Sequence, residues 1–64
     1  MSEPTDYEIV AAMERFGGSF VQALAVCCHR ADPVNFLKIK ATWPDYFTEY
    51  AEHVQRERER ASAR

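Results

Sequence analysis

The sequence has few of the residues that interrupt or cross-link a chain: two glycines, three prolines and two cysteines among 64 residues. So few glycines and prolines, in a composition that is 47% hydrophobic and 28% charged, argue against disorder across the central part of the chain. A chain of this length has room for one domain, at the lower limit of independent folding.

The sequence also lacks the features of a secreted or membrane protein. Cys27 and Cys28 are adjacent, and because adjacent side chains on a helix diverge by about 100°, they cannot form a disulfide with each other without breaking the helix. No positively charged leader precedes an apolar run at the N-terminus, which together with the cysteine usage predicts a cytoplasmic location. No segment approaches the ~20 apolar residues of a membrane span, and no membrane partner is expected.

An excess of charge of one sign is also missing. The formal net charge is −2, which is too small to indicate a nucleic-acid or membrane-surface partner. The charges are unevenly placed, however: residues 1–54 hold eight acids and four bases, whereas residues 55–64 hold two acids and four bases. The body of the chain is therefore acidic and its end basic.

Patterns of catalytic and metal-binding residues are missing too. The sequence contains no paired acids, no glycine-rich phosphate loop and no metal-binding motif. Its soft metal ligands are Cys27, Cys28, His29 and His53, and neighbouring helix residues do not aim at one point as a C-x-x-C pair does. We therefore expect no enzymatic activity, no metal and no cofactor.

What the sequence does contain is a strongly apolar stretch, residues 17–32. Its apolar residues form two adjacent stripes at helical spacing, one of Phe20, Ala23, Leu24, Cys27 and Ala31 and the other of Val21, Ala25 and Cys28. A helix that is apolar over most of its circumference must be covered on more than one side. We therefore expect this helix to be the centre of the fold, with Cys27 packed against Leu24 and Ala31, where its thiolate is disfavoured.

A first helix is predicted to begin after Thr5, because Thr5 and Glu8 match a capping box. Its inward stripe at helical spacing consists of Ile9, Ala12, Met13 and Phe16, while Tyr7 and Val10 are expected to be half covered. The helix ends at Gly17-Gly18, where glycine accepts a left-handed conformation, and Ser19 is expected to cap the next helix.

Two further helices are predicted after Asp32. Asp32 caps residues 33–41 with Pro33 in the first position, and this segment also resembles a short strand, although a lone strand would have no partner. Val34, Leu37 and Ala41 share one face of it. Thr42 or Trp43 then caps a last helix, whose inward stripe is Phe47, Tyr50, Ala51 and Val54.

These elements predict an all-α fold, a compact bundle of three to four short helices. We divide the chain into a disordered lead-in (residues 1–4), a helical domain (residues 5–54) and a solvated, charged helical tail (residues 55–64). Ion pairs from Glu52 to Arg56 and from Glu57 to Arg60 would prolong the tail as a helix.

Aromatic residues gather after residue 41, and they supply the candidate site. Tyr46, Tyr50 and His53 lie at i, i+4, i+7 beside the inward stripe of the last helix, and amphipathic aromatic residues are what protein interfaces favour. We therefore predict a partner-binding surface made of Trp43, Tyr46, Tyr50, His53 and Arg56.

Two alternatives to this interpretation are self-association, in which a second copy covers the helix at residues 17–32, and DNA binding. Residues 22–40 open with Gln-Ala-Leu-Ala, which is familiar from the first helix of helix-turn-helix regulators. The turn, however, has His29 where a small residue is expected, and the second helix offers only Lys38 and Lys40 to phosphates. Nucleic acid is therefore the less favoured partner.

Three runs of the sequence, FGGSFVQALA (16–25), RADP (30–33) and KATWPDYF (40–47), resemble a group of short proteins encoded by tailed phages and prophages. The similarity extends from about Tyr7 to Tyr50, and Cys27-Cys28-His29 departs from the usual pattern. The resemblance implies a phage accessory protein in the cytoplasm of a bacterial host, a class that often binds and diverts a host protein, sometimes a defence or regulatory component. It carries no catalytic residues over to this chain.

Overall fold

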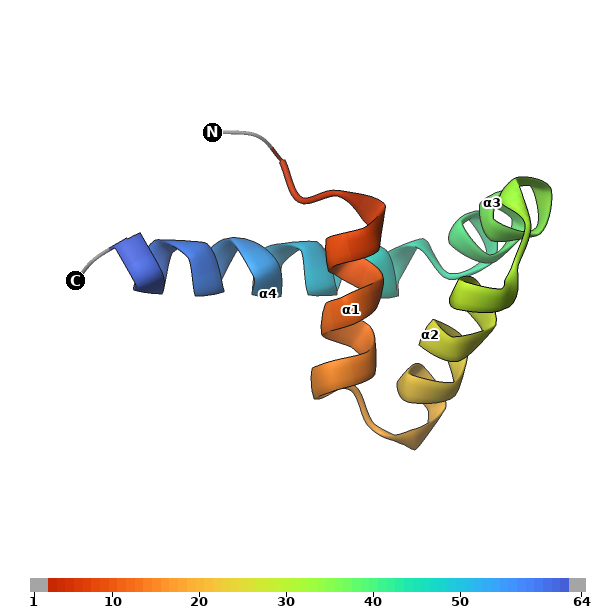
Figure 1. Cartoon of the computed structure of the whole chain (residues 1–64), viewed down its shortest axis with the longest axis horizontal. Helices are drawn as coiled ribbons and strands as arrows, with labels where there is room; N and C mark the ends of the chain where they lie inside the picture. The colour runs from red at the N-terminus through yellow and green to blue at the C-terminus, as the bar shows by residue number, and fades with distance from the viewer. Residues whose placement is uncertain (1–2, 63–64) are drawn as a thin grey trace.

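The computed structural model describes residues 3–62 and contains no strand among them. Four helices follow one another: α1 (Asp6–Phe16), α2 (Ser19–Arg30), α3 (Pro33–Thr42) and α4 (Pro44–Ser62) (Figure 1). This confirms the all-α fold class and excludes the alternative of a strand at residues 33–41. Of the predicted lead-in and tail, residues 1–2 and 63–64 lie outside the described part of the chain.

Two of the predicted helix starts are confirmed by their caps. The backbone N–H of Glu8 donates to Thr5 Oγ1 (3.2 Å), and the backbone N–H of Thr5 donates to Glu8 Oε1 (2.9 Å), which completes the capping box. At α3 the backbone N–H of Asn35 donates to Asp32 Oδ1 at 2.8 Å, with Pro33 following the cap. These bonds satisfy amides that a helix N-terminus leaves without partners.

The corner between α1 and α2 differs from the prediction. Gly17 and Gly18 have φ values of −76° and −73°, so neither is left-handed, and the cap of α2 is Gly18 rather than Ser19. Glycine is required at Gly17 for space instead, because a Cβ there would lie 2.5 Å from Val21 Cγ1.

The centre of the fold is α1 and not, as predicted, α2. α1 packs against α2 on one side and against α4 on the other, and Figure 1 shows it crossing in front of α4. Four residues of α1 are buried, Ile9, Val10, Ala12 and Met13. These residues cover a wide arc of the helix, so α1 packs against two neighbouring helices at once. Val10, for which half burial is predicted, is among the buried residues.

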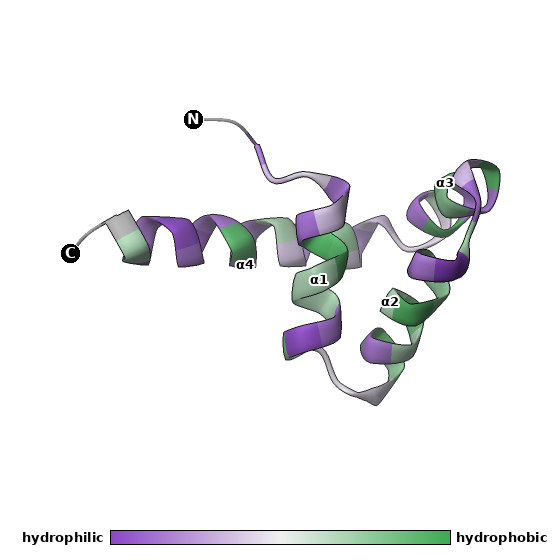
Figure 2. Ribbon diagram, viewed as in Figure 1, coloured by the Kyte–Doolittle hydropathy of each residue, from purple (hydrophilic) through white to green (hydrophobic). Residues whose placement is uncertain are grey.

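α2 is covered on one side only. Its second stripe, Val21, Ala25 and Cys28, is buried together with Leu24, whereas Phe20, Ala23 and Cys27 are exposed. The expectation that Cys27 is packed in the core is therefore wrong. Figure 2 shows hydrophobic residues along much of α2.

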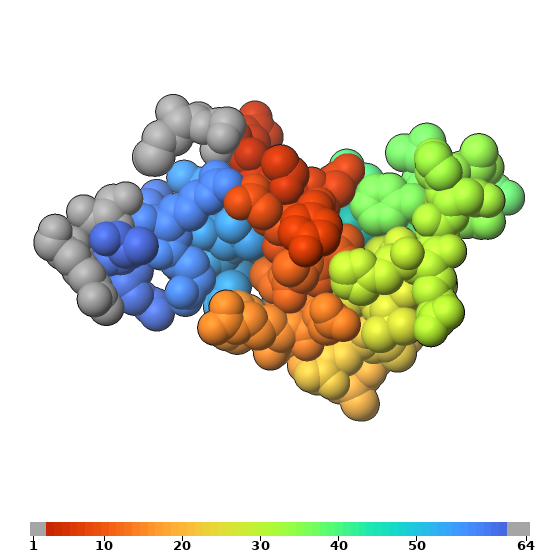
Figure 3. Space-filling model, in the orientation of Figure 1, coloured from red at the N-terminus to blue at the C-terminus, as the bar shows by residue number. Residues whose placement is uncertain are grey.

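α3 is held by few residues. Ile39 is its buried residue, the Phe36 ring meets the Phe47 ring edge-on at 5.8 Å, and Lys40 Nζ lies 2.9 Å from Asp6 Oδ1 on α1. The face that carries Val34 and Leu37 points away from the core, and each of these residues is 64% exposed. Figure 3 shows α2 and α3 together at the end of the molecule opposite the end of α4.

α4 has the predicted inward stripe: Phe47 and Tyr50 are buried, and Ala51 and Val54 pack partly buried against the core. The helix continues without a break through residues 55–62, and Arg60 forms the predicted pair with Glu57, with Nη1 at 3.1 Å from Oε2. Within the described residues, no helix is both long and apolar enough to span a bilayer.

Candidate functional site

Aromatic rings from three segments meet along the first half of α4. The Phe20 ring lies 6.1 Å from the Trp43 ring and 5.9 Å from the Tyr46 ring. The Phe16 ring lies 4.2 Å from the His53 ring. We call this set of residues, Phe16, Phe20, Trp43, Tyr46 and His53, the aromatic edge.

Of the five residues predicted for the partner-binding surface, the structure places Trp43 and Tyr46 around the Phe20 ring. His53 lies apart from these two and meets Phe16 and Tyr50, the latter at 6.3 Å between ring centroids. Tyr50 is a correction to that prediction: it is only 9% exposed and belongs to the core. Burial is also the main cause that raises the pKa of its hydroxyl, followed by the charges of Glu49 and Tyr46. Arg56 is exposed and lies outside the ring contacts.

Phe16 and Phe20 were assigned to the core by sequence reasoning, yet they are 47% and 54% exposed. They flank the Gly17-Gly18 corner, and at that corner both rings turn onto α4 instead of into the α1–α2 contact. One sequence feature points to this position: Phe16 and Phe20 lie on either side of the Gly17-Gly18 helix break. A side chain at such a corner does not continue the inward-facing stripe of either helix. With Trp43 at 38%, Phe16 and Phe20 make the most exposed part of the aromatic edge.

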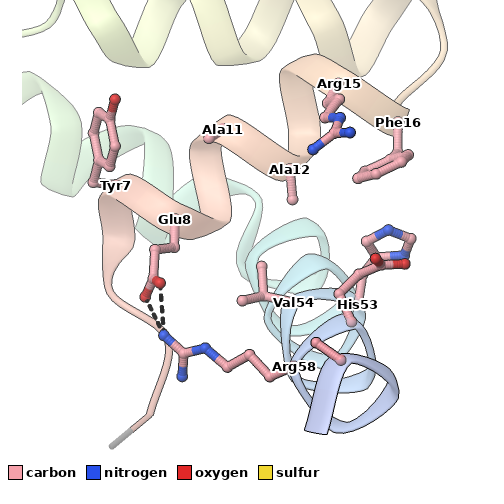
Figure 4. Close-up of a pocket in the computed structure, with 11 residues that line it drawn as sticks. Tyr7, Glu8, Ala11, Ala12, Arg15, Phe16, His53, Val54 and Arg58 are labelled. Atoms are coloured by element: carbon pink, nitrogen blue, oxygen red, sulfur yellow. Dashed lines mark hydrogen bonds and ion pairs between the residues drawn. The ribbon is translucent and has the colours of Figure 1, made fainter. Parts of the chain in front are cut away.

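A groove of about 400 Å³ begins at Phe16 and His53 and runs between α1 and α4 (Figure 4). Its volume lies within the ~300–1,000 Å³ range of ligand pockets. Apolar side chains form much of its lining, among them Ala11, Ala12 and Val54. The groove therefore adjoins the aromatic edge, with which it shares Phe16 and His53.

One end of the groove is closed by an ion pair. Arg58 Nη2 donates to both carboxylate oxygens of Glu8, at 2.7 and 2.6 Å. The pKa of the Glu8 carboxyl is lowered, first by the hydrogen bond from the Thr5 backbone N–H and then by that from Arg58. This pair ties the start of α1 to the charged part of α4, where the sequence predicted a fully solvated tail.

The other end of the groove combines a cation with two rings. The Arg15 guanidinium lies over the Phe16 ring, 5.1 Å from its centroid, and Figure 4 places Arg15, Phe16 and His53 beside one another. His53 Nε2 is buried without a hydrogen-bond partner. Packing between rings and guanidinium therefore holds this corner together.

The two cysteines are free and lie in different surroundings. Cys27 is exposed and Cys28 is buried, and burial is the main cause that raises the pKa of the Cys28 thiol. In residues 3–62, no group of three His, Cys, Asp or Glu side chains is placed to hold a metal ion.

Comparison of the chain with protein-family models, with curated proteins and with solved structures gave no match. The candidate site is therefore defined by its geometry.

Proposed function

We propose that this protein is a small, non-enzymatic phage accessory protein that binds a bacterial host protein, a defence or regulatory component, through its aromatic edge. The observation that carries the proposal is the exposure of Phe16, Phe20 and Trp43 on one edge of so small a protein. The phage setting and the bacterial cytoplasm come from the resemblance of residues 16–25, 30–33 and 40–47 to phage-encoded proteins.

Aromatic side chains suit this role for a physical reason. Trp and Tyr offer a large apolar area with few rotatable bonds, so they lose little entropy when a partner covers them, and they are enriched among the residues that dominate binding energy. Trp43 and Phe20 already contact each other edge-on. The edge is thus ordered before a partner arrives, which lowers the cost of binding.

The groove between α1 and α4 adjoins the aromatic edge and adds a concave region to the proposed binding surface. An apolar side chain of the partner would fit its lining, and Arg15 at its open end can meet an acidic residue of the partner. An exposed ridge beside an apolar pocket is the arrangement in which interface anchors are found.

The test is a nuclease-treated pull-down of the tagged protein from bacterial lysate, with bound proteins identified by mass spectrometry. We expect one host protein in near-stoichiometric amount with the wild-type chain and its loss with the double variant Phe20→Ala, Trp43→Ala. The matched control is Val34→Ala, Leu37→Ala, which removes two more exposed apolar side chains away from the edge. Equal capture by all three chains would contradict the proposal.

The helix-turn-helix alternative has less support in the structure. Lys40, one of its two candidate phosphate ligands, is paired with Asp6 at 2.9 Å. Binding to duplex DNA would show as retention that weakens steeply with salt concentration, since each phosphate contact releases counterions. Retention of that kind, with an empty nuclease-treated pull-down, would favour DNA over a host protein.

A further inference from the structure

Trp43 and Tyr46 lie next to acidic residues that form no ion pair within residues 3–62. Asp45 comes directly before Tyr46, and Glu49 and Glu52 follow Asp45 at i+4 and i+7. These three exposed acids therefore lie on one side of α4, and we call them the acidic row. Asp45 is in the first turn of the helix, where the helix dipole favours an acid. Glu49 and Glu52 lie beyond that turn, so the dipole does not account for them.

The acidic row is electrostatically unfavourable in the single chain. Asp45 and Glu49 at i, i+4, and Glu49 and Glu52 at i, i+3, are like charges at spacings that repel each other on a helix. The predicted pair between Glu52 and Arg56 does not form in the described part of the chain. The ion pairs found there are Glu14–His29, Asp6–Lys40, Glu8–Arg58 and Glu57–Arg60. A cation from outside the chain would therefore relieve a repulsion that folding leaves in place.

The rings beside the acidic row are of the kind that attracts cations. The Phe20 ring lies 6.1 Å from the Trp43 ring and 5.9 Å from the Tyr46 ring, and Phe20 and Trp43 are 54% and 38% exposed. The face of an aromatic ring is electronegative, and a guanidinium packs on it favourably. The chain itself contains one such contact, in which the Arg15 guanidinium lies 5.1 Å from the centroid of the Phe16 ring.

Glu49 is the member of the acidic row best placed to act together with these rings. It follows Tyr46 by three residues, and side chains at that spacing are neighbours on a helix surface, with Cβ atoms about 5–6 Å apart. A guanidinium can stack on a ring and donate two hydrogen bonds to a carboxylate at the same time, because its donors lie in its plane. A lysine ammonium lacks that plane. A ring beside a carboxylate therefore favours arginine over lysine.

We infer that the partner segment that binds the aromatic edge is basic, and that an arginine of this segment stacks on the rings of Trp43 and Tyr46 while it pairs with Glu49. The inference rests on the proposed function, because it states the chemistry of the partner at the same surface. It also gives a role to the acidic body of the chain, where residues 1–54 hold eight acids and four bases. A field of this sign speeds the encounter with a basic partner.

The experiment uses a short synthetic peptide of alternating leucine and arginine, with matched peptides that carry lysine or glutamate in place of arginine. Binding to the full chain is followed by the fluorescence of Trp43, the one tryptophan of the sequence. We expect the arginine peptide to bind more tightly than the lysine peptide. The glutamate peptide should bind at least about tenfold more weakly, because like charges across an interface repel. Added salt should weaken the binding of the arginine peptide, since it screens exposed charges.

Glu49→Gln tests the assigned carboxylate. It should weaken binding of the arginine peptide about threefold, the effect of one exposed ion pair, and narrow the difference between the arginine and lysine peptides. Glu59→Gln is the matched control, because Glu59 is an exposed acid further along α4 that also forms no ion pair within residues 3–62. This variant should bind the arginine peptide as the wild type does.

Equal binding of the arginine and glutamate peptides would overturn the inference, and so would equal binding by the wild type and Glu49→Gln. The pull-down separates this failure from that of the proposed function. A host protein that is lost with Phe20→Ala, Trp43→Ala but retained by Glu49→Gln at every salt concentration would contradict the inference alone. An empty pull-down together with selective binding of the arginine peptide would contradict the proposed function and support the inferred chemistry of the surface.

Discussion

At the scale of single residues, Glu8 and Gly17 show how much one position determines in so small a chain. Glu8 completes the cap of α1 and also accepts from Arg58, fifty residues further along the chain. Gly17 allows Val21 to approach the corner between α1 and α2. Glu8 and Gly17 therefore each take part both in the local backbone structure at a helix end and in a contact between two helices.

A side chain at Gly17 should therefore destabilise the fold. In Gly17→Ala the new Cβ would lie 2.5 Å from Val21 Cγ1 and 2.6 Å from the Met13 carbonyl oxygen, and overpacking of this kind costs about 1–3 kcal/mol. Gly18→Ser is the matched control, because the Cβ there meets nothing within 4 Å and serine is a good cap. Thermal unfolding should show a lower Tm for the first variant and an equal or slightly higher Tm for the second; the reverse order would contradict the geometry.

The Glu8 carboxylate should make stability depend on pH. Its pKa lies below the ordinary value of 4.5 when the chain is folded, so its contribution is present above pH 4.5 and is lost as the pH falls through the folded pKa. Urea unfolding should find the wild type more stable than Glu8→Gln at pH 6, with the difference shrinking toward pH 3. A difference independent of pH would show that charge is not the cause.

At the scale of elements, the sequence predicts where each helix lies along the chain, but it does not predict which helices pack against one another. The Thr5 and Asp32 caps and the 3.6-residue spacing act within one or two turns of the chain, so the sequence shows them directly. Which side of α2 is buried depends instead on where α1 and α4 lie, and α2 carries apolar residues on both sides. The same reason explains the candidate site: Trp43 and Tyr46 both meet Phe20 of α2, whereas Tyr50 is in the core.

The burial of one side of α2 can be tested with its adjacent cysteines. In the folded protein Cys27 is exposed, whereas Cys28 is buried with a raised pKa, and alkylation needs an accessible thiolate. Iodoacetamide should therefore modify one thiol per native chain and two per unfolded chain. Cys27→Ser should abolish the native modification and Cys28→Ser should retain it; equal reaction of both thiols in the native chain would contradict the orientation of α2.

A pair of leucines tests the same orientation through stability. Leu24 is buried against α1, whereas Leu37 on α3 is largely exposed. Leu24→Ala should cost about 2–4 kcal/mol, enough to abolish most of the stability of a small domain. Leu37→Ala should change the free energy of unfolding by less than about 0.5 kcal/mol. Similar losses for the two variants would mean that α3 packs differently from the structure.

At the scale of the whole molecule, the four helices form the predicted compact bundle, which is longer in one direction than in the others. Its radius of gyration is 12.0 Å, with extents of 38 × 24 × 18 Å. The end of α4 projects to one side and the α2–α3 arm to the other (Figure 1). Such a shape leaves apolar side chains outside the core, among them the aromatic edge and the Val34 and Leu37 face of α3.

The measurement that tests the aromatic edge most directly is fluorine NMR of the chain labelled with fluorotryptophan. Trp43 is the one tryptophan of the sequence, so a single resonance reports on the edge. On addition of the host protein recovered in the pull-down, we predict that this resonance shifts and broadens until the two proteins are equimolar, and that Phe20→Ala weakens the effect. A resonance that stays unchanged while the host protein is bound would contradict the proposed surface.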